Sequence, residues 1–330
     1  MATPRHRIVS TDITAYYHCT SRCVRGSFLC GRDQDTNKNY EHRRRWLRDR
    51  LVELAGIFGI RIGAFSIMEN HFHVILFLDT RKVDTFRPKE IVQRWHKLFK
   101  GTCLSQRYIA GDFLTYNERR QLVILTSVWR KKLCDIGWFM RCVKEPLARL
   151  ANKEDGCTGR FWEGRYHSQA LLGARAIAAC MAYVDLNPFR ASMCSQPESD
   201  KYTSLALRKA DCSSTPDSSQ DSALLPFTAE ADDPATASES LPISREQYFA
   251  LLDNTARIAR AGKNELPQKK TETVLLRLGL IPKNWCELVN NFGTHFFTMA
   301  GSRSAMTLAC EKLGKRHTWG MAAGQSLLGS

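Results

Sequence analysis

The sequence predicts an α+β protein built on a ferredoxin-like antiparallel sheet with helices. The first observation is a set of strand-like runs at residues 15–24, 61–68, 71–78 and 159–172. The second is that helical patterns separate and follow these runs, which gives the order β-α-β-β-α-β-α. That order is the ferredoxin-like plan with one closing helix. Helices on one face of such a sheet would leave the other face free for a substrate.

The first half of this plan has clear local patterns. Residues 39–58 predict an amphipathic helix, in which Leu47 and Leu51 belong to an apolar series at helical spacing. Residues 61–68 and 71–78 are strand-like runs joined by a tight turn. We therefore expect a helix followed by a β-hairpin.

The second half predicts an insertion and the closing helix. The pattern between residues 88 and 152 is helical, and the part around 86–130 is predicted to be an insertion into the ferredoxin-like plan. Residues 174–186 are rich in helix formers. Pro188 should end that helix, because the residue before a proline avoids helical backbone.

Composition divides the chain into a main domain at residues 1–210, an acidic flexible linker at 211–242 and a small helical accessory domain at 243–330. Residues 211–241 are rich in Ser, Ala, Asp and Pro and lack a periodic apolar stripe. Every predicted strand lies before the linker, so we expect residues 1–210 to fold alone. The accessory domain, with its basic helix faces, would then modulate binding.

The charge of the 330-residue chain indicates a polyanionic partner. The formal net charge is +15, and residues 211–240 hold acidic side chains but no Lys or Arg, so the remainder is more basic still. Arginines are interleaved with aromatic residues at Arg43 to Trp46, Trp129 to Lys132 and Arg160 to Tyr166. Guanidinium groups bind phosphates and aromatic faces stack on unpaired bases, so nucleic acid is favoured. The run from Arg43 to Arg45 also fits an ordinary solvated helix face.

Several classes of protein are not supported by the sequence. The twelve cysteines include no Cys-x-x-Cys pair, which argues against a zinc site or a disulfide framework. No apolar run has the length of a membrane span, and the chain opens on no signal-peptide pattern. No Walker-type phosphate loop occurs, so we expect no nucleotide cofactor. These features predict a cytoplasmic protein without a membrane partner.

Two histidines lie in the run ENHFHVILF at residues 69–77. Alternate side chains of a strand share a face, so His71 and His73 point the same way and Phe72 points to the opposite layer. Two imidazoles on one face can bind a divalent metal through one nitrogen each. A pair of polar residues on the wet face of a strand would look the same.

A reactive group and a third ligand occur about a hundred residues later. Tyr183 and Asn187 are four residues apart on the predicted helix at 174–186, so they are neighbours on one of its faces. A phenolate can attack phosphorus, and an amide oxygen beside it can complete a metal site. A core tyrosine followed by an asparagine that ends the helix is the alternative.

Together, four motifs resemble the REP-associated branch of the single-tyrosine HUH transposases. MENHFH at residues 68–73 is similar to the His-hydrophobic-His motif, and YVDLNPFRA at 183–191 to the helix that carries the nucleophile. GRFWEGRY at 159–166 is similar to the aromatic and basic strand before that helix, and YHCTSR at 17–22 to the first strand. The order and spacing of the four motifs match over roughly the first two hundred residues.

The resemblance implies an HUH nuclease fold for residues 1–210 and a metal-dependent tyrosine transesterase. Single-stranded DNA, in a hairpin or palindromic repeat, would be cleaved through a 5′-phosphotyrosine intermediate during DNA transposition. Tyr183 would be the nucleophile, and His71, His73 and Asn187 would bind Mg²⁺ or Mn²⁺, which suit imidazole, amide and phosphate ligands.

Further residues receive supporting roles. The candidate DNA-binding residues are Arg22, Arg160, Trp162, Arg165 and Arg190. Glu69, beside the first ligand, is assigned to orienting the His71 ring. His18 could line the site but is assigned to packing. Tyr166 and Tyr202 lack an amide partner four residues on and are assigned to packing or DNA contact.

Two other functions use the same residues. A nucleic-acid-binding regulator would use the sheet and the basic surface without cleaving. A metal-dependent hydrolase would release free ends, whereas a transesterase would leave a covalent protein–DNA adduct. The sequence leaves open the target DNA and the oligomeric state.

Overall fold

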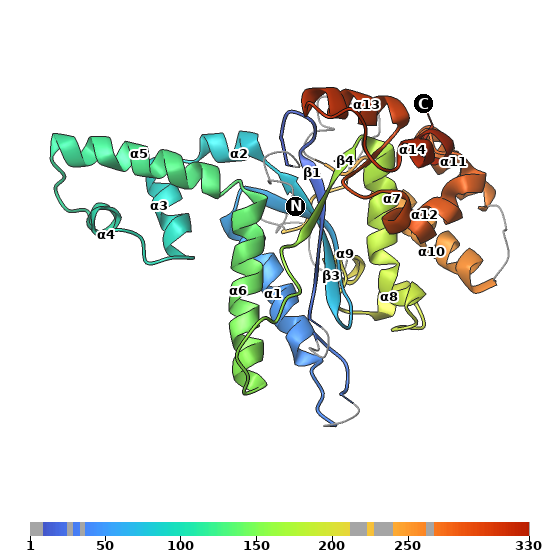
Figure 1. Cartoon of the computed structure of the whole chain (residues 1–330), viewed down its shortest axis with the longest axis horizontal. Helices are drawn as coiled ribbons and strands as arrows, with labels where there is room; N and C mark the ends of the chain where they lie inside the picture. Colours follow the sequence, from blue (N-terminus) through green and yellow to red (C-terminus); the bar gives the residue numbers. More distant parts are fainter. Residues whose placement is uncertain are drawn as a thin grey trace.

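The protein has an α+β fold around a five-stranded sheet, as the sequence predicts (Figure 1). The structure is a computed structural model that describes residues 9–24, 29–33, 37–211, 223–227, 240–261 and 267–329. The strands are β1 (Tyr16–Arg22), β2 (Ile60–Ile67), β3 (His71–Leu78), β4 (His167–Leu172) and β5 (Met299–Gly301). Their order across the sheet is β2-β3-β1-β4-β5.

The first four strands form the ferredoxin-like part of the sheet. β1 pairs antiparallel with both β3 and β4, and β3 pairs antiparallel with β2. Thr20 of β1 lies opposite both His73 of β3 and His167 of β4, and His18 lies opposite Gln169. Opposite residues share a face, as do alternate residues of one strand. We call the face that carries His18, His71, His73, His167 and Gln169 the histidine face.

Two long helices cover the other face of the sheet. α1 (His42–Ile57) and α6 (Ile136–Glu154) lie side by side on one side of the sheet. The other side carries α7 (Ala174–Asp185), α8 (Asn187–Arg190) and α12 (Trp285–His295) (Figure 1). α1 buries Leu47, Leu51 and Leu54, in agreement with the apolar series predicted for residues 39–58. These two helices are the pair that the ferredoxin-like plan places on one face.

Arg43 and Arg44 of α1 are buried, contrary to both interpretations of the basic run. The guanidinium of Arg43 pairs with Glu154 at 2.7 Å and with Asp155, and Arg44 pairs with the buried carboxylate of Asp200. The carboxylates come from distant parts of the chain, so the run itself carries no sign of them. These two arginines join elements and are neither a solvated face nor a DNA contact.

The predicted helical insertion forms an arm. α2 (Thr80–Thr85), α3 (Pro88–His96), α4 (Cys103–Ala110) and α5 (Tyr116–Lys132) follow β3, and α3 to α5 project away from the sheet (Figure 1). Trp95 stacks on Trp129 with ring centroids 5.1 Å apart and lies 5.5 Å from Trp138 of α6. Aromatic packing therefore joins the arm to the body.

A helix covers much of the histidine face, so the expectation that this face is free is wrong. α7 (Ala174–Asp185) is followed by the short α8 (Asn187–Arg190), and α7 packs against β2 and β4. Most of its residues are small or apolar and buried, which makes it a core helix. The 3₁₀ turn Pro197–Ser199 and α9 (Ser204–Asp211) follow, and α9 also contacts β2.

The C-terminal part of the chain adds helices and one strand. The helices are α10 (Arg245–Ala261), α11 (Lys269–Arg277), α12 (Trp285–His295), α13 (Arg303–Lys312) and α14 (Met321–Leu327), with a 3₁₀ turn at Pro282–Asn284. β5 pairs in parallel with β4. The prediction that every strand precedes the linker is therefore wrong, while the domain boundaries at 210 and 243 stay a prediction.

Two further expectations differ from the structure. Residues 223–227 lie inside the predicted flexible linker, yet Leu224 and Leu225 are buried and the segment hydrogen-bonds to Ile62 of β2. Apolar packing thus fixes this part, and most of the remaining linker lies outside the described residues.

The predicted strand at 159–172 begins only at His167, and before it Trp162 makes one isolated bridge to Cys23.

Two negative expectations concern cysteines and membranes. The cysteines within the described ranges are free thiols. None of the helices in the part of the chain that the structure describes combines the length and the apolar character that crossing a membrane requires.

Candidate active site

Three imidazoles lie together on the histidine face. His18 Nε2 and His73 Nδ1 are 2.9 Å apart, and the two rings stack with centroids 5.1 Å apart. The ring centroid of His71 is 5.0 Å from that of His73. Strand alternation brings His71 and His73 to one face, as predicted, and the register of β1 adds His18.

Helix α7 sets Tyr183 against these rings. The tyrosine ring stands edge-on to His73 and His18, with centroid distances of 5.5 and 6.1 Å. Asn187 lies one helical turn further on and hydrogen-bonds to the side chain of Tyr183. The structure thus places the predicted nucleophile beside two predicted ligands, Asn187 and His73. Their chemical roles stay predictions.

The surroundings of Tyr183 favour the neutral phenol but also contain groups that stabilise its anion. Burial raises the pKa of the Tyr183 hydroxyl above its ordinary value, and Cys180 adds to this shift. The guanidinium of Arg190, 5.4 Å from the ring centroid, and the hydrogen bond to Asn187 lower the pKa in turn. At neutral pH the oxygen is therefore protonated, and any attack by it requires help in losing the proton.

The C-terminal helix α12 forms one wall beside Tyr183. The ring of Phe292 lies 5.8 Å from that of Tyr183, and a Cβ on Gly293 would meet the tyrosine hydroxyl at 2.9 Å. Arg190 donates to the backbone carbonyls of Val289, at 3.3 Å, and Asn290. The predicted DNA contact Arg190 thus lies between the tyrosine and α12, where sequence reasoning expected no C-terminal residues.

The three histidines are neutral. Burial lowers the pKa of His18 and of His71 to about 4, with the charge of Arg22 contributing at His71. Burial also lowers the pKa of His73 well below its ordinary value, and the neighbouring imidazoles and Arg190 add to this. Neutral imidazole is the form that binds a metal ion.

One ring nitrogen of His73 is left without a partner in the part of the chain that the structure describes. His73 Nε2 is buried and has no hydrogen-bond partner among the described residues. A buried polar atom without a partner costs free energy unless a ligand uses it, so a cation fits at His73 Nε2, with His71 and Asn187 as the other predicted ligands. Within the described ranges, no three His, Cys, Asp or Glu side chains gather to hold a metal, so this set depends on the amide of Asn187.

Asp185, two residues after the tyrosine, is a buried junction that sequence reasoning missed. Its carboxylate accepts hydrogen bonds from the hydroxyl groups of Ser204 and Tyr248 and from the backbone N–H of Leu205. These donors belong to α9 and α10. The acidic residue at a core position of α7 was the available signal, since buried carboxylates require donors. Asp185 therefore fixes α7, and with it Tyr183, to α9 and to α10 of the C-terminal part.

The other predicted site residues are more scattered. Arg22 is exposed at the end of β1, opposite His71 in the register. Arg160 and Arg165 are exposed, but the indole of Trp162 is buried and donates to the Lys144 carbonyl at 3.0 Å. A DNA contact by these residues stays a prediction, with little of the Trp162 ring available for stacking.

Asn70, and not the predicted Glu69, contacts the first histidine. His71 Nδ1 is 2.8 Å from Asn70 Oδ1, whereas the side chain of Glu69 is exposed. In the tight turn between β2 and β3, Glu69 is turned outward while its backbone carbonyl accepts from Leu29 and Cys30. The partner of His71 is thus one residue further along the chain.

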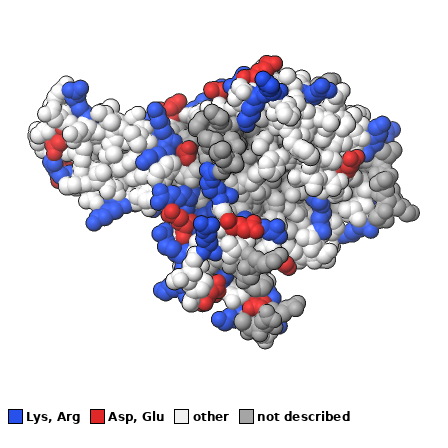
Figure 2. All heavy atoms as spheres, in the orientation of Figure 1, with Lys and Arg blue, Asp and Glu red and all other residues white. Residues whose placement is uncertain are grey.

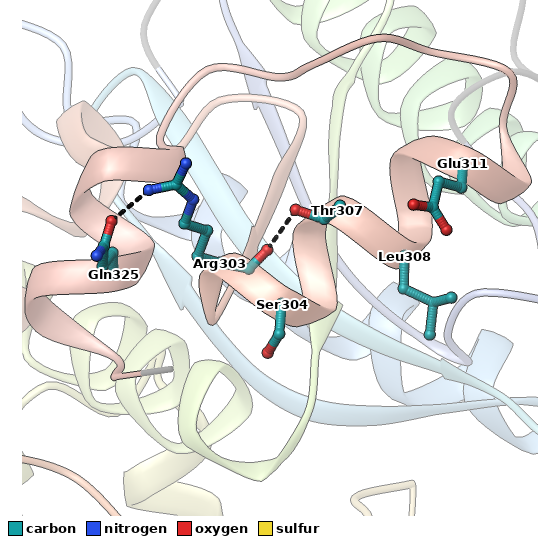
Figure 3. A pocket seen from close by; sticks show the side chains of 6 residues that line it. All are labelled: Arg303, Ser304, Thr307, Leu308, Glu311 and Gln325. Carbon is teal, nitrogen blue, oxygen red and sulfur yellow. Dashed lines mark hydrogen bonds between the residues drawn. The ribbon is translucent and has the colours of Figure 1, made fainter.

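Two hollows lie away from the histidine pair. One, of about 530 Å³, lies between α6 and residues 159–166 and is bordered by Arg141, Lys144, Arg160 and Arg165. The other, of about 500 Å³, lies against α13 and α14, where Arg303 donates to Gln325 at 2.6 Å (Figure 3).

Lys and Arg are scattered over the face in Figure 2 with acidic side chains among them, so that face shows no single basic patch.

Comparisons with known proteins give one solved structure. No protein-family model and no curated protein matches the chain. The solved structure is described as a REP-associated tyrosine transposase bound to a REP hairpin, and it is similar to this chain at 12% identity with a TM-score of 0.37. The match covers 65% of this chain and 89% of that chain. An identity and a TM-score this low carry no argument about function.

Proposed function

We propose that the protein is a metal-dependent tyrosine transesterase that cleaves single-stranded DNA, with hairpin or palindromic-repeat DNA as its substrate and DNA transposition as its biological reaction. The observation that carries the proposal is the position of the Tyr183 phenol. It hydrogen-bonds to Asn187, and its ring stands edge-on to the neutral ring of His73. The family motifs in the sequence agree with this arrangement. We place the protein in the cytoplasm, on the nucleoid when it is bound to DNA.

The reaction exchanges one phosphate ester for another. The oxygen of Tyr183 attacks phosphorus, the bond from phosphorus to the 3′ oxygen breaks, and the 5′ phosphate stays on the tyrosine. The phenol loses one proton and the leaving 3′ oxygen gains one. The phosphotyrosine keeps the energy of the broken bond, so a 3′-hydroxyl can reverse the reaction without a nucleotide cofactor.

The residues around Tyr183 have distinct tasks. Arg190 and Asn187 stabilise the phenolate as its proton leaves. Packing between α7 and the histidine face holds the Tyr183 ring in one orientation. A reacting group that is already oriented lowers the entropic part of the activation barrier. Mg²⁺ or Mn²⁺, held by His71, His73 and Asn187, would draw negative charge from the scissile phosphate.

The test is a covalent adduct between the full-length chain and labelled hairpin DNA in the presence of Mg²⁺. Tyr183→Phe removes only the attacking oxygen, so we expect it to keep DNA binding and lose the denaturant-resistant adduct. Tyr116→Phe, a control at an exposed tyrosine of α5 in the arm, should keep the adduct. An adduct that persists in Tyr183→Phe would overturn the assignment.

The competing functions predict other results in the same assay. A wild-type chain that binds the hairpin without nicking it would be a non-cleaving regulator. A wild-type chain that nicks without an adduct would be a metal-dependent hydrolase. If EDTA does not diminish cleavage by the wild-type protein, the proposed dependence on a divalent metal ion is contradicted.

A further inference from the structure

A chain of hydrogen bonds runs from a backbone carbonyl to the centre of the histidine face. Gln169 Nε2 donates to the carbonyl of Phe296 at 2.7 Å. Gln169 Oε1 is 3.1 Å from His18 Nδ1, and His18 Nε2 is 2.9 Å from His73 Nδ1. Phe296 follows the end of α12, and the other three residues lie on β4, β1 and β3. The hydrogen bonds therefore run across three neighbouring strands of the sheet.

The carbonyl of Phe296 decides the direction of the first two bonds. A carbonyl oxygen only accepts, so the amide of Gln169 must turn its NH₂ group toward it. Its oxygen then faces His18 Nδ1, and an amide oxygen also only accepts. The proton of the His18 ring is therefore on Nδ1.

The same logic fixes the second histidine. His18 is 4% exposed and buries a neutral ring, so a proton on Nδ1 leaves Nε2 as an acceptor. The facing atom, His73 Nδ1, must then donate, and the proton of the His73 ring is on Nδ1. The lone pair of the ring is left on Nε2, the buried atom for which no partner exists among the described residues.

We infer that His18 and Gln169, anchored by the Phe296 carbonyl, are positioning residues that hold the proton of His73 on Nδ1 and keep its Nε2 lone pair available. The use of that lone pair by a metal rests on the proposed function. Partners behind a ligating histidine fix its tautomer and its orientation, and their loss lowers metal affinity by about 10- to 100-fold. His18 thus acts through His73 and is more than a packing residue.

The tautomer is tested on the full-length chain without metal. Histidine labelled with ¹⁵N in the ring gives two-dimensional spectra in which a protonated and an unprotonated ring nitrogen have different shifts. We expect His73 to show a protonated Nδ1 and an unprotonated Nε2, and Gln169→Leu to give a mixture of the two tautomers. A wild-type His73 that is protonated on Nε2 would overturn the inference.

Metal binding supplies a second readout that does not depend on cleavage. We expect His18→Leu to weaken Mn²⁺ binding, measured by calorimetry on the full chain, by about 10- to 100-fold. His18→Gln places an amide oxygen near the position of Nε2 and should restore most of the affinity. Equal affinity in all three proteins would overturn the positioning role, with thermal unfolding as a check that the variants fold.

The two proposals fail in different ways. A wild-type chain that binds no Mn²⁺ but shows the expected His73 tautomer would contradict the metal site and leave the hydrogen-bond chain standing. Cleavage and metal binding with the opposite tautomer would leave the proposed function standing and remove the role of His18.

Discussion

At the scale of single residues, Gly293 of α12 lies against the tyrosine hydroxyl and leaves no room for a Cβ. A Cβ at this position would meet that oxygen at 2.9 Å, so Gly293→Ala requires the ring of Tyr183 to shift. A shift of the ring moves the attacking oxygen away from its reactive position. Because a reaction is slowed when a reacting group is misplaced, we expect adduct formation to slow by about 10- to 100-fold. Alanine in place of a helical glycine should at the same time leave the thermal stability unchanged or slightly higher.

Gly56→Ala is the matched control for this prediction. Gly56 lies in α1 and has open space where its Cβ would be. The variant should show the same small gain in helix stability without any change in the rate of adduct formation. An unchanged rate in Gly293→Ala would mean that the hydroxyl tolerates the shift and that α12 does not set its position.

At the scale of elements, β1 contains two buried phenols that link its stability to alkaline pH. Tyr16 donates to the carbonyl of Ser240 at 3.0 Å, and Tyr17 donates to that of Ser10 at 2.8 Å. Burial raises the pKa of each hydroxyl from 10.0 to about 12. The native state therefore keeps protons that the unfolded state loses above pH 10, so the stabilisation is complete below pH 10 and falls as the pH rises toward 12.

The measurement is the free energy of unfolding in denaturant between pH 8 and about 12, with Tyr17→Phe as the variant that removes one titrating group. We expect the wild type to lose stability across this range and the variant to lose it less steeply. Parallel curves for the two proteins would show that Tyr17 does not titrate with unfolding.

Elements also differ in how well their sequence predicts them. β3 begins and ends where its strand-like run predicts, and α7 does so within one residue, because the residues that define each element are neighbours in the sequence. Met299 to Gly301 is too short to carry a pattern and becomes a strand only by pairing with β4. The role of His18 depends on the register of three strands, which no spacing along the chain reveals.

At the scale of the whole molecule, the C-terminal elements and the site depend on each other. A chain ending at Ala210 lacks β5, α12 and the Phe296 carbonyl, and it leaves buried Asp185 without the hydroxyl of Tyr248. A buried acceptor that loses its donor costs about 1–3 kcal/mol. We therefore expect a lower free energy of unfolding and no DNA adduct from this shorter chain.

Tyr248→Phe in the full-length chain separates the two effects. It removes the same hydrogen bond while it keeps α12 and β5, so it should lose about 1–3 kcal/mol of stability and still form the adduct. If the chain ending at Ala210 is as stable as the full-length protein and cleaves hairpin DNA, the prediction of an independent domain at residues 1–210 holds.

The pairing of β5 with β4 also sets a time order during synthesis of the chain. β4 ends at Leu172 and β5 begins at Met299, so the ribosome must add every residue from 173 to 301 before the two strands can pair in full. Contacts between such distant segments close late in folding. A nascent chain stalled before Phe296 would hold the tyrosine and all three histidines yet lack the carbonyl that anchors Gln169. Cleavage competence would thus arrive only after Phe296 has left the ribosome, and ribosome-bound chains with Phe296 inside or outside the exit tunnel would show whether adduct formation switches on between them.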